Sequence, residues 1–234
     1  MEIKKYKISS VRNDGTNVKI FTLESTNGHN VQFKPGQFVN LYLLENGNFS
    51  IFRQFSIASG PSSAQLEFCI KILQDGKFTS ALDKLSIGAE IGLAGPFGHF
   101  VYQGQKECVF IAAGTGIAPM MSMLRYINEN KIDGEFIVLY TNKTEDSIIY
   151  YNELKKLQAE NKNIKVVFTL TQETPAHWQG ELGRISSEMV EKYVTKSNER
   201  MWFFCGPVEF VKTIKEHALG KGAQPDKMKI EGWG

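Results

Sequence analysis

Short segments in which apolar and polar side chains alternate fill the first hundred residues. A period of two is typical of strands that bury one face. Turn signals such as Lys34-Pro35-Gly36-Gln37 separate these segments. We expect strands over 6–12, 17–23, 38–43, 52–58, 66–73 and 90–94, and a short helix over 78–85. The pattern indicates an antiparallel barrel or sandwich, and we favour a Greek-key β-barrel.

A different pattern begins near residue 105. The continuous apolar run over 108–113 is typical of a parallel strand that is covered on both faces. Strands are predicted over 108–113, 136–140, 164–170 and 201–205, alternating with helices over 120–127, 150–160, 186–193 and 209–219. This alternation predicts a doubly wound parallel sheet with helices on both faces. The polar segment 102–106 marks the boundary, so we expect a β-barrel domain over 1–104 and an α/β domain over 105–234.

Composition narrows the class of protein. Of 234 residues, 42% are apolar, and the formal net charge is +2, which gives no basis for a nucleic-acid partner. No apolar run approaches the roughly 20 residues that span a bilayer. The segment Met1–Lys5 lacks the apolar stretch of a secretory signal. We therefore expect a cytoplasmic protein without a membrane span.

Cysteines and histidines indicate no metal centre. Cys69, Cys108 and Cys205 lie among apolar neighbours, which predicts buried, reduced thiols. Their wide spacing is unlike that of an iron–sulfur loop. The four histidines are scattered and do not have the spacing of metal ligands: His29, His99, His177 and His217.

The segment Arg53-Gln54-Phe55-Ser56 combines a cation, an aromatic ring and a hydroxyl. On a strand, Arg53, Phe55 and Ser59 point to one face, and Gln54 and Ser56 point to the other. Arg53 can bind phosphate oxygens, and Phe55 can stack on a flat ring such as a flavin. The same residues also fit an ordinary half-buried strand with a surface arginine.

A second segment, Asp75-Gly76-Lys77-Phe78-Thr79-Ser80, precedes the predicted short helix. Glycine relieves steric restriction, and the free N–H groups at a helix start can hold phosphate. The alternative is a plain helix cap in which Thr79 or Ser80 satisfies the first turn.

Two further segments lie where strands of the second half end. Gly114-Thr115-Gly116 and Pro119 form a strand-to-helix turn that lets the backbone approach a pyrophosphate, although a tight turn without a ligand fits as well. Cys205-Gly206-Pro207 ends the fourth strand, where ligands of such sheets bind. A buried structural cysteine is the alternative for Cys205.

These motifs resemble those of the ferredoxin–NADP reductase superfamily, with the FAD/NAD(P)-binding module of cytochrome b5 reductases and flavohaemoglobins. The family's Arg-x-Tyr-Ser signature is similar to Arg53, Phe55 and Ser56, with Phe in place of Tyr. Its Gly-x-x-Ser/Thr segment matches Gly76 to Thr79, and its Gly-x-Gly-x-x-Pro segment matches Gly114 to Pro119.

The resemblance implies a bound FAD, with FMN less favoured. Arg53 and the N–H groups of Lys77, Phe78 and Thr79 would hold the pyrophosphate, and Phe55 would stack on the flavin ring. Ile70 and Lys71 would lie along the ribityl–phosphate region. Ser56 would reach the ring edge.

The resemblance also implies a site for NADH or NADPH. Cys205 would contact the nicotinamide by packing, Glu231 would lie near the flavin ring and Trp233 would cover it. Ser56, Cys205, Glu231 and Trp233 would thus line the hydride path as the catalytic residues. The other nucleotide-binding residues would be Gly114, Thr115, Gly116, Pro119, Asn142, Gly206 and Pro207. Local charge favours NADH, because Lys143 is offset by Glu145 and Asp146.

The predicted function is that of an NAD(P)H-dependent flavoprotein reductase. Hydride would pass from NAD(P)H to FAD, and electrons would then pass to a separate acceptor. That acceptor would be a ferredoxin-like, oxygenase or haem protein, or a small molecule. An NAD(P)H:free-flavin reductase is the main alternative. A redox-sensing regulatory subunit ranks last, because such subunits usually carry a cysteine cluster after the nucleotide domain.

Overall fold

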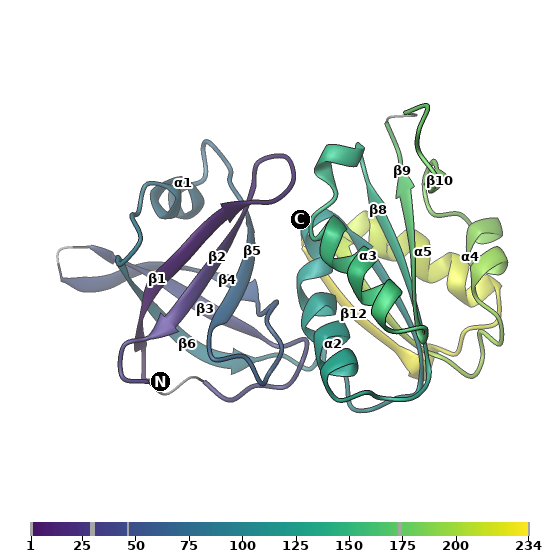
Figure 1. Ribbon diagram of the computed structural model, residues 1–234, viewed down its shortest axis with the longest axis horizontal. Helices are drawn as coiled ribbons and strands as arrows, with labels where there is room; N and C mark the ends of the chain where they lie inside the picture. Colours follow the sequence, from purple (N-terminus) through teal and green to yellow (C-terminus); the bar gives the residue numbers. More distant parts are fainter. Residues whose placement is uncertain (1, 29–30, 46, 173–174, 234) are drawn as a thin grey trace. The chain divides into compact units, whose positions relative to one another are not determined.

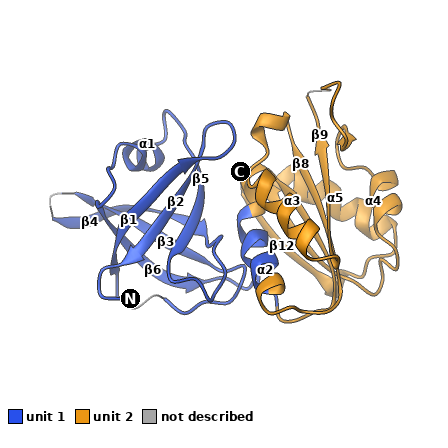
Figure 2. Ribbon diagram, in the orientation of Figure 1, with its two compact units in different colours: residues 1–102, 118–126 blue, residues 103–117, 127–234 orange. Residues whose placement is uncertain are grey.

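The computed structural model describes residues 2–28, 31–45, 47–172 and 175–233 and divides the chain into two compact units (Figures 1 and 2). Unit 1 comprises residues 1–102 and 118–126, and unit 2 comprises 103–117 and 127–234. Met1 and His29, which the sequence analysis considered, lie outside the described residues. Each unit is described by itself.

Unit 1 is an antiparallel sheet with the strand order β4-β3-β6-β1-β2-β5. Its elements are β1 (Lys4–Asn13), β2 (Val18–Ser25), β3 (Phe38–Glu45), β4 (Asn48–Ser56), β5 (Leu66–Lys71), α1 (Lys77–Asp83) and β6 (Glu90–Phe97). An isolated bridge between Ile57 and Phe68 joins the two ends of the sheet. The N–H of Ala58 adds a hydrogen bond of 2.8 Å to the carbonyl of Glu67. The predicted antiparallel barrel is confirmed as a barrel-like sheet that is not fully closed.

The core of unit 1 follows the alternation that predicted its strands. On β3, Val39, Leu41 and Leu43 are buried, whereas the residues between them are half-buried. Tyr6 is also fully buried, and its hydroxyl accepts a 3.0 Å hydrogen bond from the N–H of Val31. The buried phenol thus satisfies a backbone donor that burial would otherwise leave unpaired.

Unit 2 is a parallel sheet with the strand order β10-β9-β8-β7-β11-β12. Its strands are β7 (Glu107–Ala113), β8 (Glu135–Asn142), β9 (Ile164–Leu170), β10 (Glu181–Leu182), β11 (Met201–Pro207) and β12 (Met228–Trp233). The chain builds outward from β7 to one side as far as β10 and then continues on the other side with β11. The strand order therefore reverses between β7 and β11, and ligands of such sheets bind beyond the carboxyl ends at that point.

Helices lie between these strands, as the sequence predicts: α2 (Ile117–Glu129), α3 (Tyr151–Glu160), α4 (Ser187–Tyr193) and α5 (Val208–Gly220). Short 3₁₀ turns are η1 (Gly114–Gly116), η2 (Glu145–Ser147) and η3 (Pro225–Lys227). The doubly wound fold is confirmed. Residues 118–126 of α2 group with unit 1, where Arg125 donates hydrogen bonds of 2.8 Å to the carbonyl of Ala58 and to the carboxylate of Glu67.

The strand β12 is the main element that the sequence analysis did not predict. Apolar Met228 and Ile230 alternate with Lys229 and Glu231, a short signal that was missed, although the exposure of the strand does not follow a strict period of two. It forms because β11 offers an unpaired edge, along which Trp202 to Pro207 align with Met228 to Trp233. Tertiary pairing therefore decides this element.

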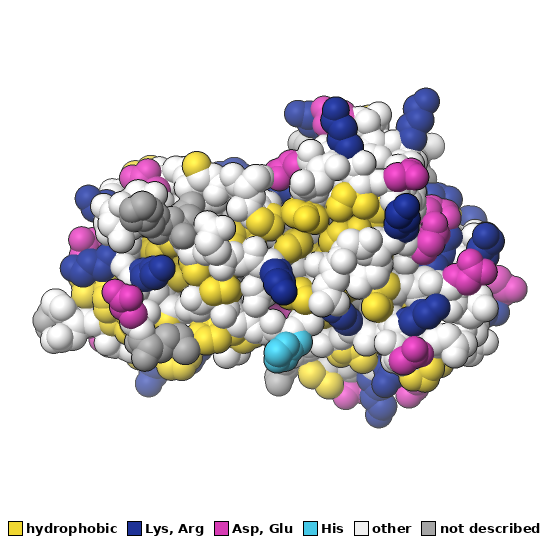
Figure 3. All heavy atoms as spheres, turned by 90° about the horizontal axis from the view of Figure 1, so that it is seen from below, with side chains coloured by type: hydrophobic (Ala, Val, Ile, Leu, Met, Phe, Trp, Pro, Cys, Tyr) yellow, Lys and Arg dark blue, Asp and Glu magenta, His cyan; other side chains and the backbone are white. Residues whose placement is uncertain are grey.

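On the face drawn in Figure 3, acidic and basic side chains are mixed, and no large area carries a single sign of charge. This agrees with the small net charge of +2. Among the described residues, no helix has the length and apolar character needed to cross a bilayer.

Candidate functional site

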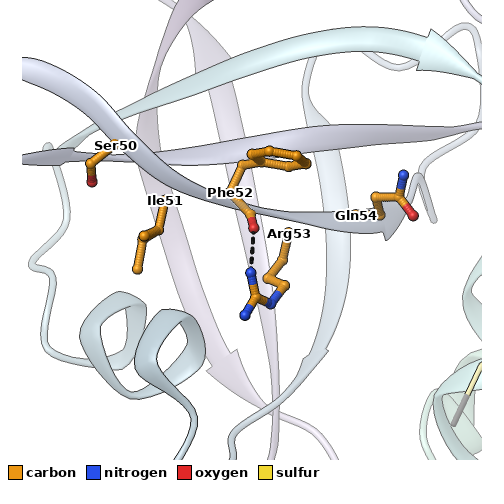
Figure 4. A pocket seen from close by; sticks show the side chains of 5 residues that line it. All are labelled: Ser50, Ile51, Phe52, Arg53 and Gln54. Carbon is orange, nitrogen blue, oxygen red and sulfur yellow. Dashed lines mark hydrogen bonds between the residues drawn. The ribbon is translucent and has the colours of Figure 1, made fainter.

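Arg53 lies on β4 beside an open pocket of about 620 Å³ that is lined by Ser50, Ile51, Phe52, Arg53 and Gln54 (Figure 4). The Arg53 side chain extends to one side of the strand and the Phe52 ring to the other. Arg53 is exposed, and its Nη1 donates a 2.8 Å hydrogen bond to the carbonyl of Phe52. The guanidinium keeps further donors that face solvent and can bind an anion.

Phe55 and Ser56 complete the predicted flavin motif at the end of β4. Phe55 is half-buried, and its ring centroid lies 5.6 Å from that of Phe78. The strand ends at Ser56, as a role at a ring edge requires. The prediction that Ser59 shares the face of Arg53 is wrong, because the chain has left the strand. Ser59 is buried, and its hydroxyl accepts a hydrogen bond from the N–H of Glu67.

The start of α1 has the form that a phosphate site needs. No side chain caps this helix, whose N-cap residue is Gly76. The hydroxyl of Thr79 accepts a hydrogen bond of 3.1 Å from the N–H of Leu73 instead, and it donates one to the carbonyl of Leu73. The helix-cap alternative is therefore wrong. The first N–H groups of the helix, from Lys77 onward, have no partner within the helix itself and can donate to a ligand.

Gly76 is required by close packing. A Cβ at this position would lie 2.6 Å from Oγ1 of Thr79 and 3.0 Å from Cβ of Leu73. The backbone conformation itself is extended, with φ of −80°. The loop can close on the helix start only because residue 76 has no side chain.

On β5, the two predicted contact residues differ in what they offer. Ile70 is fully buried in the core of unit 1, so only its main chain can meet a ligand. Lys71, at the end of the strand, is exposed and offers a cation. Strand β5 is at the edge of the sheet, so one side of its main chain lies outside the ladder.

In unit 2, the glycine turn η1 sits against the end of β11. A Cβ on Gly116 would lie 2.2 Å from the carbonyl oxygen of Cys205, so only glycine fits. Gly114 has open space around it. Glycine is favoured there because its φ of +52° is a left-handed backbone conformation. Thr115 lies between them, and Pro119 falls in the first turn of α2, where its missing N–H has no helical partner to lose.

Tyr140 lies on β8 and binds this turn, and the sequence analysis missed it. It is fully buried on β8, and its hydroxyl donates a 2.9 Å hydrogen bond to the carbonyl of Gly114. The same hydroxyl accepts a 3.3 Å hydrogen bond from the N–H of Ile149. The phenol thus joins the glycine turn to the segment before α3. No sequence signal marks it, because tyrosine is common in strands.

The ends of β11 and β12 bring five predicted residues together, with Gly232 as the sixth member of three pairs. The parallel register aligns Cys205 with Glu231, Gly206 with Gly232 and Pro207 with Trp233. Burial raises the pKa of the Cys205 thiol well above its usual value, and the charge of Glu231 raises it further. Both effects favour the neutral thiol, which fits a packing role for Cys205. Trp233 stays 41% exposed, so its indole surface is available to a ligand.

Asn142 is the last residue of β8, which pairs with β7 on the side away from β11. It is buried, and its Nδ2 has no hydrogen-bond partner within the described part of the chain. Its carbonyl accepts a 2.9 Å hydrogen bond from the N–H of Thr171. A buried amide without a partner is costly, so a ligand that accepts its hydrogen bond would be stabilised here.

Comparison with known proteins identifies two domain families in the chain. Residues 5–102 match the family of oxidoreductase FAD-binding domains, and residues 110–216 match the family of oxidoreductase NAD-binding domains. Both motif sets of the sequence analysis fall inside these ranges. The architecture is thus that of a two-domain oxidoreductase module. The two halves of the chain thus match the FAD-binding and the NAD-binding domain families of oxidoreductases, which the resemblance to the ferredoxin–NADP reductase superfamily predicted.

Two curated relatives illustrate the similarity. Cytochrome b5 reductase 4 of Bos taurus is 32% identical over 168 residues, which cover 69% of this chain and 32% of that protein. The glycine betaine monooxygenase reductase subunit of Chromohalobacter salexigens is 29% identical over 196 residues, which cover 81% of this chain and 53% of that protein. The chain thus spans about a third and about half of the length of these relatives.

A solved structure shows the same fold over the whole chain. The flavohaemoglobin-like FAD/NAD-binding domain of nitric oxide dioxygenase from Vibrio cholerae superposes with a TM-score of 0.91. The match covers 100% of both chains at 18% sequence identity. At this identity the likeness establishes the fold alone.

Proposed function

We propose that this protein is an NAD(P)H-dependent flavoprotein reductase that passes electrons to a separate acceptor. One observation carries the proposal: the glycine turn Gly114–Gly116 is packed on the carbonyl of Cys205 at the point where the strand order of unit 2 reverses. That is where a sheet of this kind binds a dinucleotide. We assign the FAD-binding domain to residues 1–104 and the NAD(P)-binding domain to residues 105–234.

Unit 1 has groups that fit FAD. The exposed guanidinium of Arg53 and the uncapped start of α1 supply donors for the pyrophosphate. Phe55 offers an aromatic surface for the flavin ring, and Ser56 a hydroxyl at its edge. Ile70 contributes its main chain and Lys71 its charge. When bound, the flavin supplies the capacity to accept a hydride and to release electrons singly.

Unit 2 has groups that fit a nicotinamide dinucleotide. The main chain of Gly114, Thr115 and Gly116 would bind its phosphates, and the unpartnered amide of Asn142 would donate to it. Cys205, Gly206 and Pro207 would hold the nicotinamide by packing. Glu231 would place a negative charge near the flavin ring. Trp233 would cover the flavin ring and exclude water from it.

The acceptor is proposed from the names of the relatives and from chemistry. One relative is a cytochrome b5 reductase and another is the reductase subunit of a monooxygenase. A haem or iron–sulfur protein therefore fits best, and a small-molecule acceptor is the second choice. Measuring NADH-dependent reduction of cytochrome b5, of a ferredoxin and of ferricyanide distinguishes them. Buried free cysteines accord with a cytoplasmic location.

Flavin retention tests the site in unit 1. The purified protein should carry a yellow chromophore that NADH bleaches under anaerobic conditions. Replacing Arg53 with Ala removes a charge contact to the pyrophosphate, so the affinity for FAD should fall about tenfold to a hundredfold. Arg12→Ala is the matched control, because Arg12 is an exposed arginine of the same unit that pairs with Asp14. Equal FAD affinity in the two variants would refute the role of Arg53.

A free-flavin reductase remains the second candidate for one reason. Phe55 stands where the family has a tyrosine, so a phenol hydrogen bond to the flavin is absent. Weak binding would make the flavin a substrate that leaves during gel filtration. The distinction is the stoichiometry of FAD per chain after gel filtration: near one for the proposed reductase and near zero for the alternative.

A further inference from the structure

An ion pair lies where the two end strands of the unit 1 sheet meet. Nη1 of Arg125, on α2, is 2.8 Å from Oε1 of Glu67, on β5. The same nitrogen donates a 2.8 Å hydrogen bond to the carbonyl of Ala58. The two side chains are 16% and 18% exposed, so solvent screens this pair less than a pair on the open surface.

Ala58 belongs to the segment 57–59, which follows β4 directly and which we call the closing segment. All three of its residues are almost fully buried. The main chain of Glu67 contacts this segment twice. Its carbonyl accepts a 2.8 Å hydrogen bond from the N–H of Ala58, and its N–H donates a 3.1 Å hydrogen bond to the hydroxyl of Ser59. Arg125 therefore binds both sides of the junction, the closing segment through Ala58 and β5 through Glu67.

Main-chain pairing at this junction is short. The strands β3 and β4 pair from end to end. The closing segment, by contrast, meets β5 through an isolated bridge between Ile57 and Phe68 and the hydrogen bond from Ala58 to Glu67. A short link opens at a lower free energy than a long ladder, because fewer contacts must break at once. The two hydrogen bonds that Arg125 donates therefore restrain a larger share of the movement here than they would beside a long ladder.

The position of Arg125 is fixed by its neighbours on α2. This part of the helix groups with unit 1, as the colours of Figure 2 show. A Cβ on Gly36 would lie 2.4 Å from Cε of Met123, so this methionine packs directly on the turn before β3. The ring of Tyr126 meets that of Tyr102 edge-on, with 6.2 Å between the centroids. The helix thus holds the guanidinium at a defined place against the barrel.

Both end strands carry residues of the proposed flavin site. Phe55 and Ser56 lie at the end of β4, just before Ala58. Ile70 and Lys71 lie at the end of β5. The junction therefore sets the distance between the residues proposed to contact the flavin ring and those proposed to lie along the ribityl–phosphate region. Bound ligands are sensitive to such distances, because a displacement of about 1 Å already weakens their contacts.

We propose that Arg125 is a positioning residue of the flavin site. By holding Ala58 and Glu67 together, it fixes the ring of Phe55 and the hydroxyl of Ser56 relative to β5. It acts through the closing segment and not by contact with the flavin. The inference rests on the proposed flavin site. It adds a residue that sequence comparison alone assigns elsewhere, since Arg125 falls in the range 110–216 that matches the NAD-binding family.

Arg125→Met tests the proposal, because it removes both hydrogen bonds and keeps an unbranched side chain. The full chain, freed of flavin, would be titrated with FAD, and visible circular dichroism would be recorded at saturation. The dissociation constant for FAD should rise about tenfold, since part of the loss of a charge-assisted pair reaches the ligand. The flavin bands should change in sign or intensity, because the ring would lie differently against Phe55. Arg125→Lys keeps a cation with donors and should recover most of both effects.

Tyr6→Phe is the control that separates position from stability. It removes a buried hydrogen bond in the core of the same unit and none of the hydrogen bonds at the junction. It should lower the free energy of unfolding and leave the affinity for FAD and the flavin bands as they are in the unmodified chain. If Arg125→Met leaves the bands unchanged, or if Tyr6→Phe changes them equally, Arg125 has a structural role only and the inference is overturned.

Glu67→Gln decides the question if Arg125→Met does not fold. The amide retains an oxygen that can accept from Arg125 and loses only the charge. The dissociation constant for FAD should rise about threefold and the flavin bands should change, and unchanged values would overturn the inference. If the unmodified chain binds FAD and the variants bind it equally, only the inference fails. If the unmodified chain binds no FAD, the flavin site of the proposed function fails as well.

Discussion

Single residues of this protein are fixed by contacts that the sequence does not display. The sequence identifies Gly76 and Gly116 as members of phosphate-binding motifs, and the structure shows why neither can carry a Cβ: Thr79 lies against one and the carbonyl of Cys205 against the other. Tyr140 shows the opposite case, since its role depends on two partners that are distant in sequence, Gly114 and Ile149. Chemistry at one position can be predicted from a motif, but a contact across the fold cannot.

Tyr140→Phe tests the link between the glycine turn and the segment before α3. The variant leaves a part-buried carbonyl and a buried N–H without their partner, so the free energy of unfolding should fall by about 1–3 kcal/mol. The turn should also lose its fixed position, so the KM for NADH should rise about tenfold while kcat at saturation changes little. Steady-state kinetics and urea unfolding measure the two effects.

Tyr6→Phe is the control for that experiment. Tyr6 is equally buried and also accepts a hydrogen bond from a backbone N–H, that of Val31, but it lies in the core of unit 1. It should lose comparable stability and keep the KM for NADH. The same rise in KM in both variants would show that general loss of stability, and not the glycine turn, is responsible.

At the scale of elements, most strands and helices follow from periodicity, while their ends and the last strand do not. The predicted strand over 164–170 coincides with β9, and the helix over 209–219 with α5 to within a residue at each end. The strand predicted over 52–58 begins earlier, at Asn48, because β4 pairs with β3 back to the turn at their junction. The strand β12 shows only the short alternation from Met228 to Glu231, and its pairing with β11 cannot be read from that local pattern.

Elements of unit 2 are also joined at the amino ends of their strands by Arg200. Its side chain is 1% exposed, and it pairs with Glu107 at 3.1 Å and with Glu135. Its Nε donates a 2.6 Å hydrogen bond to the carbonyl of Thr195. A single guanidinium therefore connects β7, β8 and the segment before β11.

Arg200→Met should destabilise unit 2 without affecting the nucleotide site. The loss should be about 2–3 kcal/mol in the free energy of unfolding, because charge-assisted hydrogen bonds disappear while both carboxylates remain partly solvated. The affinity for NADH should not change, since the site lies at the carboxyl ends. Lys156→Met, which removes an exposed pair with Glu160, is the control and should cost less than about 0.5 kcal/mol. Equal losses in the two variants would contradict the structural role of Arg200.

At the scale of the whole molecule, the three cysteines serve as probes of folding in both units. Cys69 lies in unit 1, and Cys108 and Cys205 lie in unit 2, and all are buried and free. Burial, and then the charge of Glu107, raises the pKa of Cys108 to about 12. Burial likewise raises the pKa of Cys69 and of Cys205. Thiolates are the reactive form, so the folded chain holds its cysteines in an unreactive state.

Thiol labelling should therefore follow unfolding. The folded protein should react very slowly with Ellman's reagent at pH 8, and urea should release three reactive thiols per chain.

The raised pKa values of the buried thiols also make stability depend on pH. Because each thiol has a higher pKa in the folded chain than in the unfolded chain, the stability that it confers is present below the unfolded pKa and is lost as the pH rises. For Cys108 this loss should run from about pH 9 to about pH 12, at about 1.4 kcal/mol per pH unit. A Cys108→Ala variant should show a shallower decline between pH 9 and pH 10.5, and an identical decline would contradict the assignment.

The sequence by itself determined the two kinds of sheet and the motifs for a flavin and for a nicotinamide nucleotide, and hence the resemblance to a family of oxidoreductases. It could do so because periodicity and short motifs depend on neighbours along the chain. Only the tertiary structure decided that Glu231 lies beside Cys205, that Tyr140 holds Gly114 and that His177 meets Glu145. These pairs join residues about 26 to 32 positions apart, and only the folding of the sheet and its loops brings them together.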